Sequence, residues 1–187
     1  MLSQLPINLS KVSKKYRLAD INYAIDLLTA ADVKERSEAA VKILLKIKRV
    51  KELFKSELVE MEKEVSREIK RIVDAHRQKA LSLDNGKILF YEIKSGLAVR
   101  GSISDALQQM YPGKIVIIGE IENTHYALSF GTITANVDFP TLIRKSIENM
   151  EGAHGGGHAK AAGCKIKLED KERFLERFIR YLNNKYV

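Results

Sequence analysis

The chain has 187 residues, of which 45% are hydrophobic and 30% charged, and its formal net charge is +8 at pH 7. This length suits one compact domain with an extension, or two small lobes. The sequence has no apolar run long enough for a membrane-spanning helix. Its single cysteine, Cys164, excludes an internal disulfide and a cysteine-based zinc cluster. We therefore expect a cytoplasmic protein.

The positive charge is concentrated in the first part of the chain. Residues 1–83 hold 18 Lys or Arg against 12 Asp or Glu, whereas residues 84–187 hold 14 against 12. An excess on this scale permits contact with nucleic acid or with an acidic protein, and it does not select between them.

Residues 1–83 read as a helical region. They contain one proline, Pro6, and no glycine, and these two residue types are the usual breaks between elements. We expect Asp20 to cap a helix over 21–30, with a short break near 31–32. One very long helix then follows over about 34–81, and it would extend roughly 70 Å.

An apolar stripe runs along this long helix at an average spacing of about 3.6 residues, the period of a straight helix. A helix of that length reaches beyond a small lobe. Part of the stripe must therefore face another helix of this chain, a second copy in a homodimer, or a different protein. The stripe ends at Ile72, and its candidate partner-binding residues are Ile43, Ile47, Val50, Phe54, Leu58, Met61, Val65 and Ile69.

Residues 84–187 read as a small α/β domain with a mixed sheet, so the predicted fold class is α+β with a helical region before the sheet domain. The turn residues 84–86 mark the boundary. The run 114–121, KIVIIGEI, is apolar over most of its length, which indicates a central strand buried on both faces. The other expected strands are 87–93, 97–100, 126–130 and 164–168. A capping box at 102–105 should open a helix through Met110, Asp138 should cap a second with Pro140 in its first turn, and 169–186 should form a third.

The segment 152–164, GAHGGGHAKAAGC, is the candidate site. Three glycines allow a loop with exposed backbone amides. The alanine-rich residues after them can start a short helix whose N-terminus attracts a phosphate, with two side chains as further donors. As a bare pattern, a glycine triplet also occurs as a tight connection. The candidate nucleic-acid or anion-binding residues are Gly155, Gly156, Gly157, His158 and Lys160.

A metal site and a cofactor are not expected at this segment. His154 and His158 are four residues apart, a spacing that could hold a metal on a helix. The glycines between them disfavour that helix, and no Asp or Glu lies between the two histidines.

The same segment, preceded by VDFPTLIRKSIENM, resembles the signature of the accessory domain of DHH-family phosphoesterases, the RecJ-like nucleases and oligonucleotide hydrolases. It is most similar to archaeal members with the run VDLPSLIRKA…GGGH…AAG. The resemblance is close over 138–168. It is looser over 18–80, where the chain resembles the end of the RecJ catalytic domain and its connecting helix. The resemblance implies nucleic-acid binding, with Gly155 to His158 as the GGGH motif facing a metal site across a cleft.

Two departures from the family bear on activity. The sequence has no Asp-His-His triplet and no cluster of carboxylates for two-metal cleavage, so we expect no catalytic residues and no nuclease activity from this chain alone. Family members also carry an arginine after the strand equivalent to 127–129, where this chain reads Phe130-Gly131. Arg144 and Lys145 could compensate, or be ordinary surface charges on their predicted helix.

The resemblance implies two competing functions. The first is a non-catalytic RecJ-like subunit of an archaeal DNA replication complex, nucleoid-associated, which binds GINS, and through it the MCM helicase, and contacts single-stranded DNA. The alternative is a stand-alone module that binds single-stranded nucleic acid or nucleotides. A third reading, an enzyme acting on small phosphorylated molecules, would need a catalytic domain in trans.

Overall fold

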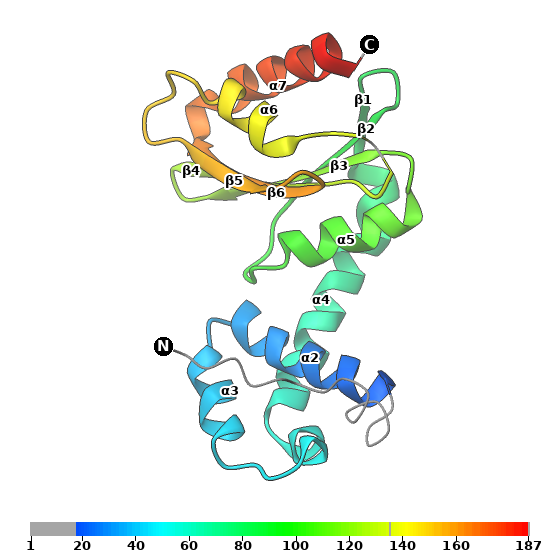
Figure 1. Cartoon of the computed structure of the whole chain (residues 1–187), viewed down its shortest axis with the longest axis vertical. Coiled ribbons are helices and arrows are strands. Elements are labelled where there is room, and N and C mark those ends of the chain that lie inside the picture. Colours follow the sequence, from blue (N-terminus) through cyan, green and yellow to red (C-terminus); the bar gives the residue numbers. More distant parts are fainter. Residues whose placement is uncertain (1–17, 135, 187) are drawn as a thin grey trace, which may run out of the picture. The chain divides into compact units, whose positions relative to one another are not determined.

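The computed structural model describes residues 18–134 and 136–186, and these fall into two compact units (Figure 1). One unit ends at Arg67 and the other begins at Glu68, so the division falls inside a helix. The sequence had placed the boundary later, at the turn over 84–86.

The first unit is helical. It contains α2 (Leu18–Val33), α3 (Ser37–Leu44), a 3-10 helix η1 (Val50–Lys55) and the first turns of α4 (Leu58–Lys79). Helix α2 contacts both α3 and η1, and the rings of Tyr23 and Phe54 lie 5.1 Å apart. Ion pairs Lys34–Glu64 and Arg36–Glu57 also join distant parts of this unit.

The predicted single helix over 34–81 is wrong. The segment forms α3, η1 and α4, and the longest helix, α4, has 22 residues. The chain leaves helical geometry at Glu35, where φ is 54°, and at Arg49, which is extended. The apolar residues keep a helical spacing across these breaks, but tertiary packing rather than that spacing decides where a helix continues.

The apolar stripe is consequently not one continuous exposed surface. Leu58, Met61 and Val65 are buried, which corrects the expectation that they are open to a partner. The other five candidates, Ile43, Ile47, Val50, Phe54 and Ile69, are half-buried.

The second unit is built on a six-stranded sheet with the order β1-β2-β3-β4-β6-β5. Strands β2 and β3 are parallel, and every other neighbouring pair is antiparallel. The sheet is thus mixed, as predicted. The strand bounds are β1 (Leu81–Leu83), β2 (Ile88–Ile93), β3 (Ile115–Glu122), β4 (His125–Gly131), β5 (His154–His158) and β6 (Ala161–Lys167).

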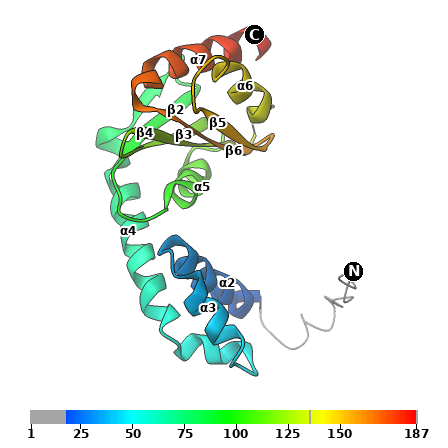
Figure 2. The same ribbon diagram turned by 90° about the vertical axis from the view of Figure 1, so that its left-hand side faces the viewer.

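Helices cover the two faces of this sheet unequally (Figure 2). Helices α6 (Phe139–Ser146) and α7 (Lys171–Tyr186, after the 3-10 helix η2, Leu168–Asp170) lie on one face. Helix α5 (Arg100–Met110) lies on the other, against β3 and β4.

The main core fills the space between the sheet and the pair α6–α7. Four phenylalanines meet there, with the rings of Phe130 and Phe178 only 5.0 Å apart. The predicted inner face of the last helix is confirmed, because Phe174, Phe178 and Leu182 are buried and Leu175 and Ile179 pack against the same cluster.

Local sequence signals predict some of the element boundaries correctly and others wrongly. Strand 114–121 is confirmed as β3, buried on both faces over most of its length, and Asp138 caps α6 by accepting a hydrogen bond from the Thr141 amide. The predicted strand at 97–100 is wrong, because α5 already begins at Arg100. That helix has no side-chain cap, so the predicted capping box is also wrong.

The turn over 84–86 does not end the long helix. It joins β1 to β2 as an antiparallel hairpin, and its three residues all have positive φ. The predicted turn is confirmed, and so is the strand after it, expected at 87–93 and found as β2. The element before the turn is wrong, because β1 rather than the end of a helix leads into it.

Candidate functional site

The GGGH motif lies in an edge strand rather than in a loop. Strand β5 pairs with β6 in a register that matches His154 with Lys165, Gly156 with Gly163 and His158 with Ala161. The expected short helix after the glycines is therefore wrong, since these residues form β6. Pairing of 161–167 with β4 supplies a full ladder of backbone hydrogen bonds, and this outweighs the helix propensity of the alanines.

The three glycines have different surroundings. A Cβ on Gly155 would lie 2.6 Å from Cβ of Cys164 and 2.7 Å from Cγ2 of Ile143, so this position points into the α6 side. Gly157 has a φ of +140°, and its Cβ would lie 2.6 Å from the Ala161 carbonyl oxygen. A Cβ on Gly156 would meet nothing within 4 Å. Only Gly156 therefore presents open backbone.

The pairing register places one set of positions on the face of the sheet away from α6. These positions alternate along each strand, and we call them the β5–β6 open face: His154, Gly156, His158, Ala161, Gly163 and Lys165. Residues 154–161 are all exposed. The outer edge of β5 is unpaired among the described strands, so backbone N–H groups are available there as donors.

A hollow of ≈ 420 Å³ lies on this face. Its floor is made by small residues, including Gly156, Gly163 and Ser129, and its cationic groups are Arg100 and Lys165. Arg100 is the first residue of α5. Arg100 is not among the predicted site residues, because no sequence signal near residue 100 connects it to residues 154–165.

Two carboxylates hold the cations of the hollow. Arg100 Nη1 donates to Glu120 Oε2 at 2.9 Å and also to Glu122. The Lys165 ammonium donates to Glu122 Oε2 at 2.9 Å. Hydrogen bonds from Lys165, and then from Arg100, lower the pKa of Glu122. A phosphate entering the hollow would therefore compete with Glu122 for both cations.

Arg100 keeps an unused donor. Its Nε is buried and has no hydrogen-bond partner among the described residues. A guanidinium carries five N–H donors in a planar fork, and both glutamates are bound by Nη1, so an anion in the hollow would bind through Nη2 rather than through the buried Nε.

The predicted site residues are only partly brought together. Gly156 and His158 lie on the open face, whereas Gly155 and Gly157 serve packing and chain geometry. Lys160 lies in the turn between the two strands, and its ammonium donates to the Ile133 carbonyl at 2.9 Å. His154, not among the predicted binding residues, joins the open face and lines the hollow.

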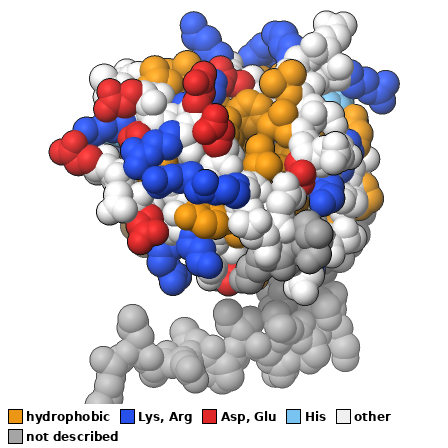
Figure 3. All heavy atoms as spheres, turned by 90° about the horizontal axis from the view of Figure 1, so that it is seen from above, with side chains coloured by type: hydrophobic (Ala, Val, Ile, Leu, Met, Phe, Trp, Pro, Cys, Tyr) orange, Lys and Arg blue, Asp and Glu red, His pale blue; other side chains and the backbone are white. Residues whose placement is uncertain are grey.

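The arginine that the resemblance implies near 130–131 is absent here. A Cβ on Gly131 would lie 2.0 Å from Gln108 Nε2 and 2.8 Å from Ser104 Oγ, both on α5, so a side chain at this position would require these two side chains to move. Arg144 and Lys145 cannot replace it at the open face, because they are exposed residues of α6, which covers the other face of the sheet. Seen from the α6–α7 side, the surface mixes basic and acidic side chains (Figure 3).

Neither a metal-binding cluster nor a membrane-spanning helix is found among the described residues. Within 18–134 and 136–186, no three His, Cys, Asp or Glu side chains come together in a way that could hold a metal ion. Among the helices of the same residues, none is long and apolar enough to cross a membrane.

The fold and the motif agree with a comparison to known families. Residues 85–184 match the family model described as the DHHA1 domain, and the chain belongs to this family. Comparison with curated proteins gives no match.

Solved structures extend the likeness beyond the family match. RecJ from Thermus thermophilus in complex with Mg²⁺ aligns with a TM-score of 0.66 and 15% identity, over 85% of this chain and 24% of that one. An exonuclease RecJ bound to manganese gives 0.60 and 16%, over 83% and 38%. CDC45 from Entamoeba histolytica gives 0.51 and 10%, over 66% and 28%. At these identities the likeness establishes a DHH-type fold, and this chain spans about a quarter of the first RecJ structure's length.

Proposed function

We propose that this chain is a non-catalytic RecJ-like subunit that binds single-stranded nucleic acid along the β5–β6 open face. The observation that carries the proposal is the exposed backbone at Gly156, beside the half-buried Gly163 and flanked by His154, Lys165 and Arg100. Because glycine has no side chain, a phosphate can approach the backbone amides of these strands closely. The three flanking side chains supply charged or polar donors.

The affinity of this face is expected to be modest. Glu120 and Glu122 offset Arg100 and Lys165. No Phe, Tyr or Trp lines the hollow, so the imidazole of His154 is the one ring in its lining on which a base can stack. Binding should therefore depend mainly on phosphate contacts, and should weaken steeply as salt increases.

Fluorescence anisotropy with a labelled single-stranded oligonucleotide tests this proposal. We expect His154→Ala and Lys165→Gln each to weaken binding about threefold to tenfold, while His125→Ala, a histidine of the same unit outside the hollow, serves as the matched control. Absence of binding at low salt, or equal affinity in all three variants, would reject the open face as the binding site.

We further propose that a partner protein docks on α3, and that the partner is the GINS complex, through which the chain reaches the MCM helicase. Two observations support this surface. Val41, Leu44 and Leu45 are 53%, 44% and 82% exposed, and they lie on one side of the helix at i, i+3 and i+4. Residues 41–55 also hold six Lys or Arg and one acidic residue, which suits an acidic partner segment.

Size exclusion with the GINS subunits of the same organism tests the partner proposal. The native chain should co-elute with them at micromolar concentration, and Leu45→Asp should abolish this. Leu81→Asp, which changes another exposed leucine, 56% exposed and outside α3, should not. A chain that binds the oligonucleotide but never GINS would leave the stand-alone nucleic-acid module as the better proposal.

The non-catalytic character remains part of the proposal. It is supported by the lack of an Asp-His-His triplet in the sequence. Incubation of the purified chain with Mn²⁺ or Mg²⁺ and a labelled oligonucleotide should leave the substrate intact, and cleavage that disappears with chelator would refute this.

A further inference from the structure

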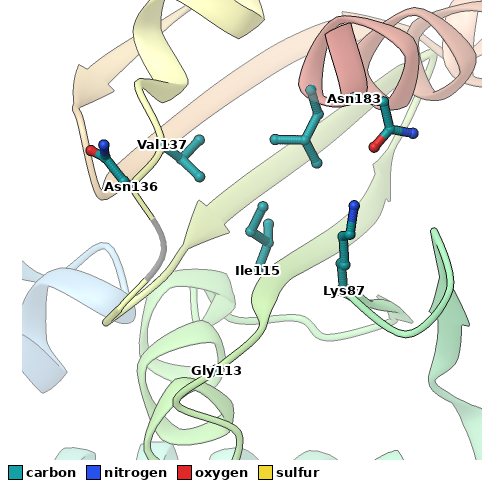
Figure 4. A pocket seen from close by; sticks show the side chains of 7 residues that line it. Lys87, Gly113, Ile115, Asn136, Val137 and Asn183 are labelled. Carbon is teal, nitrogen blue, oxygen red and sulfur yellow. The ribbon is translucent and has the colours of Figure 1, made fainter. Parts of the chain in front are cut away.

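A second concave site lies where β2 and β3 begin and α7 ends, and it is separate from the open face. It is a cavity of ≈ 330 Å³, at the lower end of the range for small-molecule sites. Its walls carry three apolar side chains and three polar ones (Figure 4): Ile115, Val137 and Leu182, and Lys87, Asn136 and Asn183.

The apolar wall is rigid. Ile115, Val137 and Leu182 are 5%, 6% and 4% exposed and belong to the main core cluster. Their positions are therefore held by core packing, and this wall exists before any ligand arrives.

One polar group of the cavity is oriented by a buried partner. The amide nitrogen of Asn183 donates to Asp84 Oδ1 at 3.0 Å, and the Asp84 side chain is only 8% exposed. This bond consumes a donor of Asn183 and turns its amide oxygen toward the cavity, as Figure 4 shows. The cavity thus presents a fixed hydrogen-bond acceptor.

The cationic group is a single lysine. The Lys87 side chain is 57% exposed and lies 3.8 Å from Asp84 Oδ2, too far for a hydrogen bond. Its three N–H donors remain available, and Asn136 adds an exposed amide. Lys87 forms an ion pair with Asp84, which offsets part of its positive charge, so the cavity suits a single carboxylate, held by hydrogen bonds from one ammonium, better than a phosphate dianion.

These groups together define a ligand class. We propose that the cavity binds a small carboxylate that carries an apolar side chain and an N–H donor, the chemistry of an N-acylated apolar amino acid. The side chain packs on Ile115, Val137 and Leu182, the carboxylate pairs with Lys87, and the N–H donates to the oxygen of Asn183. Such a group is found in a free small acid and in the C-terminal residue of a peptide.

A ¹H–¹⁵N NMR titration of the full chain with N-acetyl-leucine tests the proposal. We expect shifts at the amides of Lys87, Ile115 and Asn183, with a Kd of about 1 mM, typical of a ligand this small. N-acetyl-leucinamide, which lacks the charge, should bind at least about tenfold more weakly.

A matched pair of variants isolates the role of the lysine. Lys87→Gln should weaken N-acetyl-leucine binding about tenfold. Lys94→Gln, an exposed lysine just after the other end of β2, should leave it unchanged. Equal affinities in these two variants would show that Lys87 does not bind the carboxylate of N-acetyl-leucine, and would overturn the proposal.

Two further ligands distinguish a free acid from a peptide C-terminus, and an apolar acid from a nucleotide. A short peptide ending in leucine that binds more tightly than N-acetyl-leucine identifies a chain terminus as the source, and equal affinity identifies the free acid. The proposal is overturned if N-acetyl-leucine produces no shift up to ~10 mM, if the shifts lie outside the cavity, or if adenosine monophosphate binds there more tightly.

Discussion

Alanine substitutions at the glycine triplet separate structural from binding roles within one motif. Gly155→Ala places a methyl group 2.6 Å from Cβ of Cys164 and 2.7 Å from Cγ2 of Ile143. These neighbours are only 6% and 1% exposed, so they have little room to move. Overpacking of this kind costs about 1–3 kcal/mol of unfolding free energy.

The other two glycines should respond differently from Gly155. Gly157→Ala meets a φ of +140° and a carbonyl oxygen at 2.6 Å, and backbone strain of this type also costs about 1–3 kcal/mol. Gly156→Ala enters open space, so its stability should change by less than about 0.5 kcal/mol. Its methyl group should nevertheless weaken oligonucleotide binding, because it raises the floor of the hollow.

Urea unfolding followed by circular dichroism measures the three stabilities, with midpoints compared at a common slope. The reasoning is refuted if Gly156→Ala is destabilised as much as its neighbours, or if Gly155→Ala unfolds at the same midpoint as the native chain. Anisotropy on Gly156→Ala then tests the binding role on a folded protein.

Further predictions concern the Glu122 carboxylate and the Cys164 thiol. Glu122→Gln should tighten oligonucleotide binding about threefold at low salt, since it frees Lys165 and Arg100; weaker anisotropy binding would contradict the competition. The lowered pKa of Glu122 means that its contribution to stability is present above pH ~4.3 and is lost as the pH falls below that, a loss that urea titrations of Glu122→Gln should lack. Burial raises the pKa of the Cys164 thiol to about 12, so iodoacetamide at pH 8 should label it only in urea. Because the unfolded thiol ionises near pH ~8.5, stability should fall as the pH rises from there toward 12, and Cys164→Ala should flatten that decline.

Local patterns were sufficient for elements whose character depends on near neighbours. The mostly apolar run 114–121 became β3, buried because it pairs on both edges and is covered on both faces. Asp138 and Pro140 start α6 as predicted, because an N-cap needs only residues within one turn. The GGGH motif likewise identified the family from its residues alone.

Elements that depend on distant partners were beyond the sequence. Periodicity along 34–81 is the same whether the helix continues or folds back, and only contacts with α2 decide between the two. The motif became a strand because β4 offers 161–167 a paired edge.

The candidate site shows the same division most clearly. The sequence by itself determined that residues 155–157 carry no side chain, since glycine lacks one wherever the fold places it. The tertiary structure decided which glycine faces the open side, through a register that alternates by single residues. It also decided which cations meet there, because Arg100 reaches Glu120 and Glu122 only once α5 packs beneath β3.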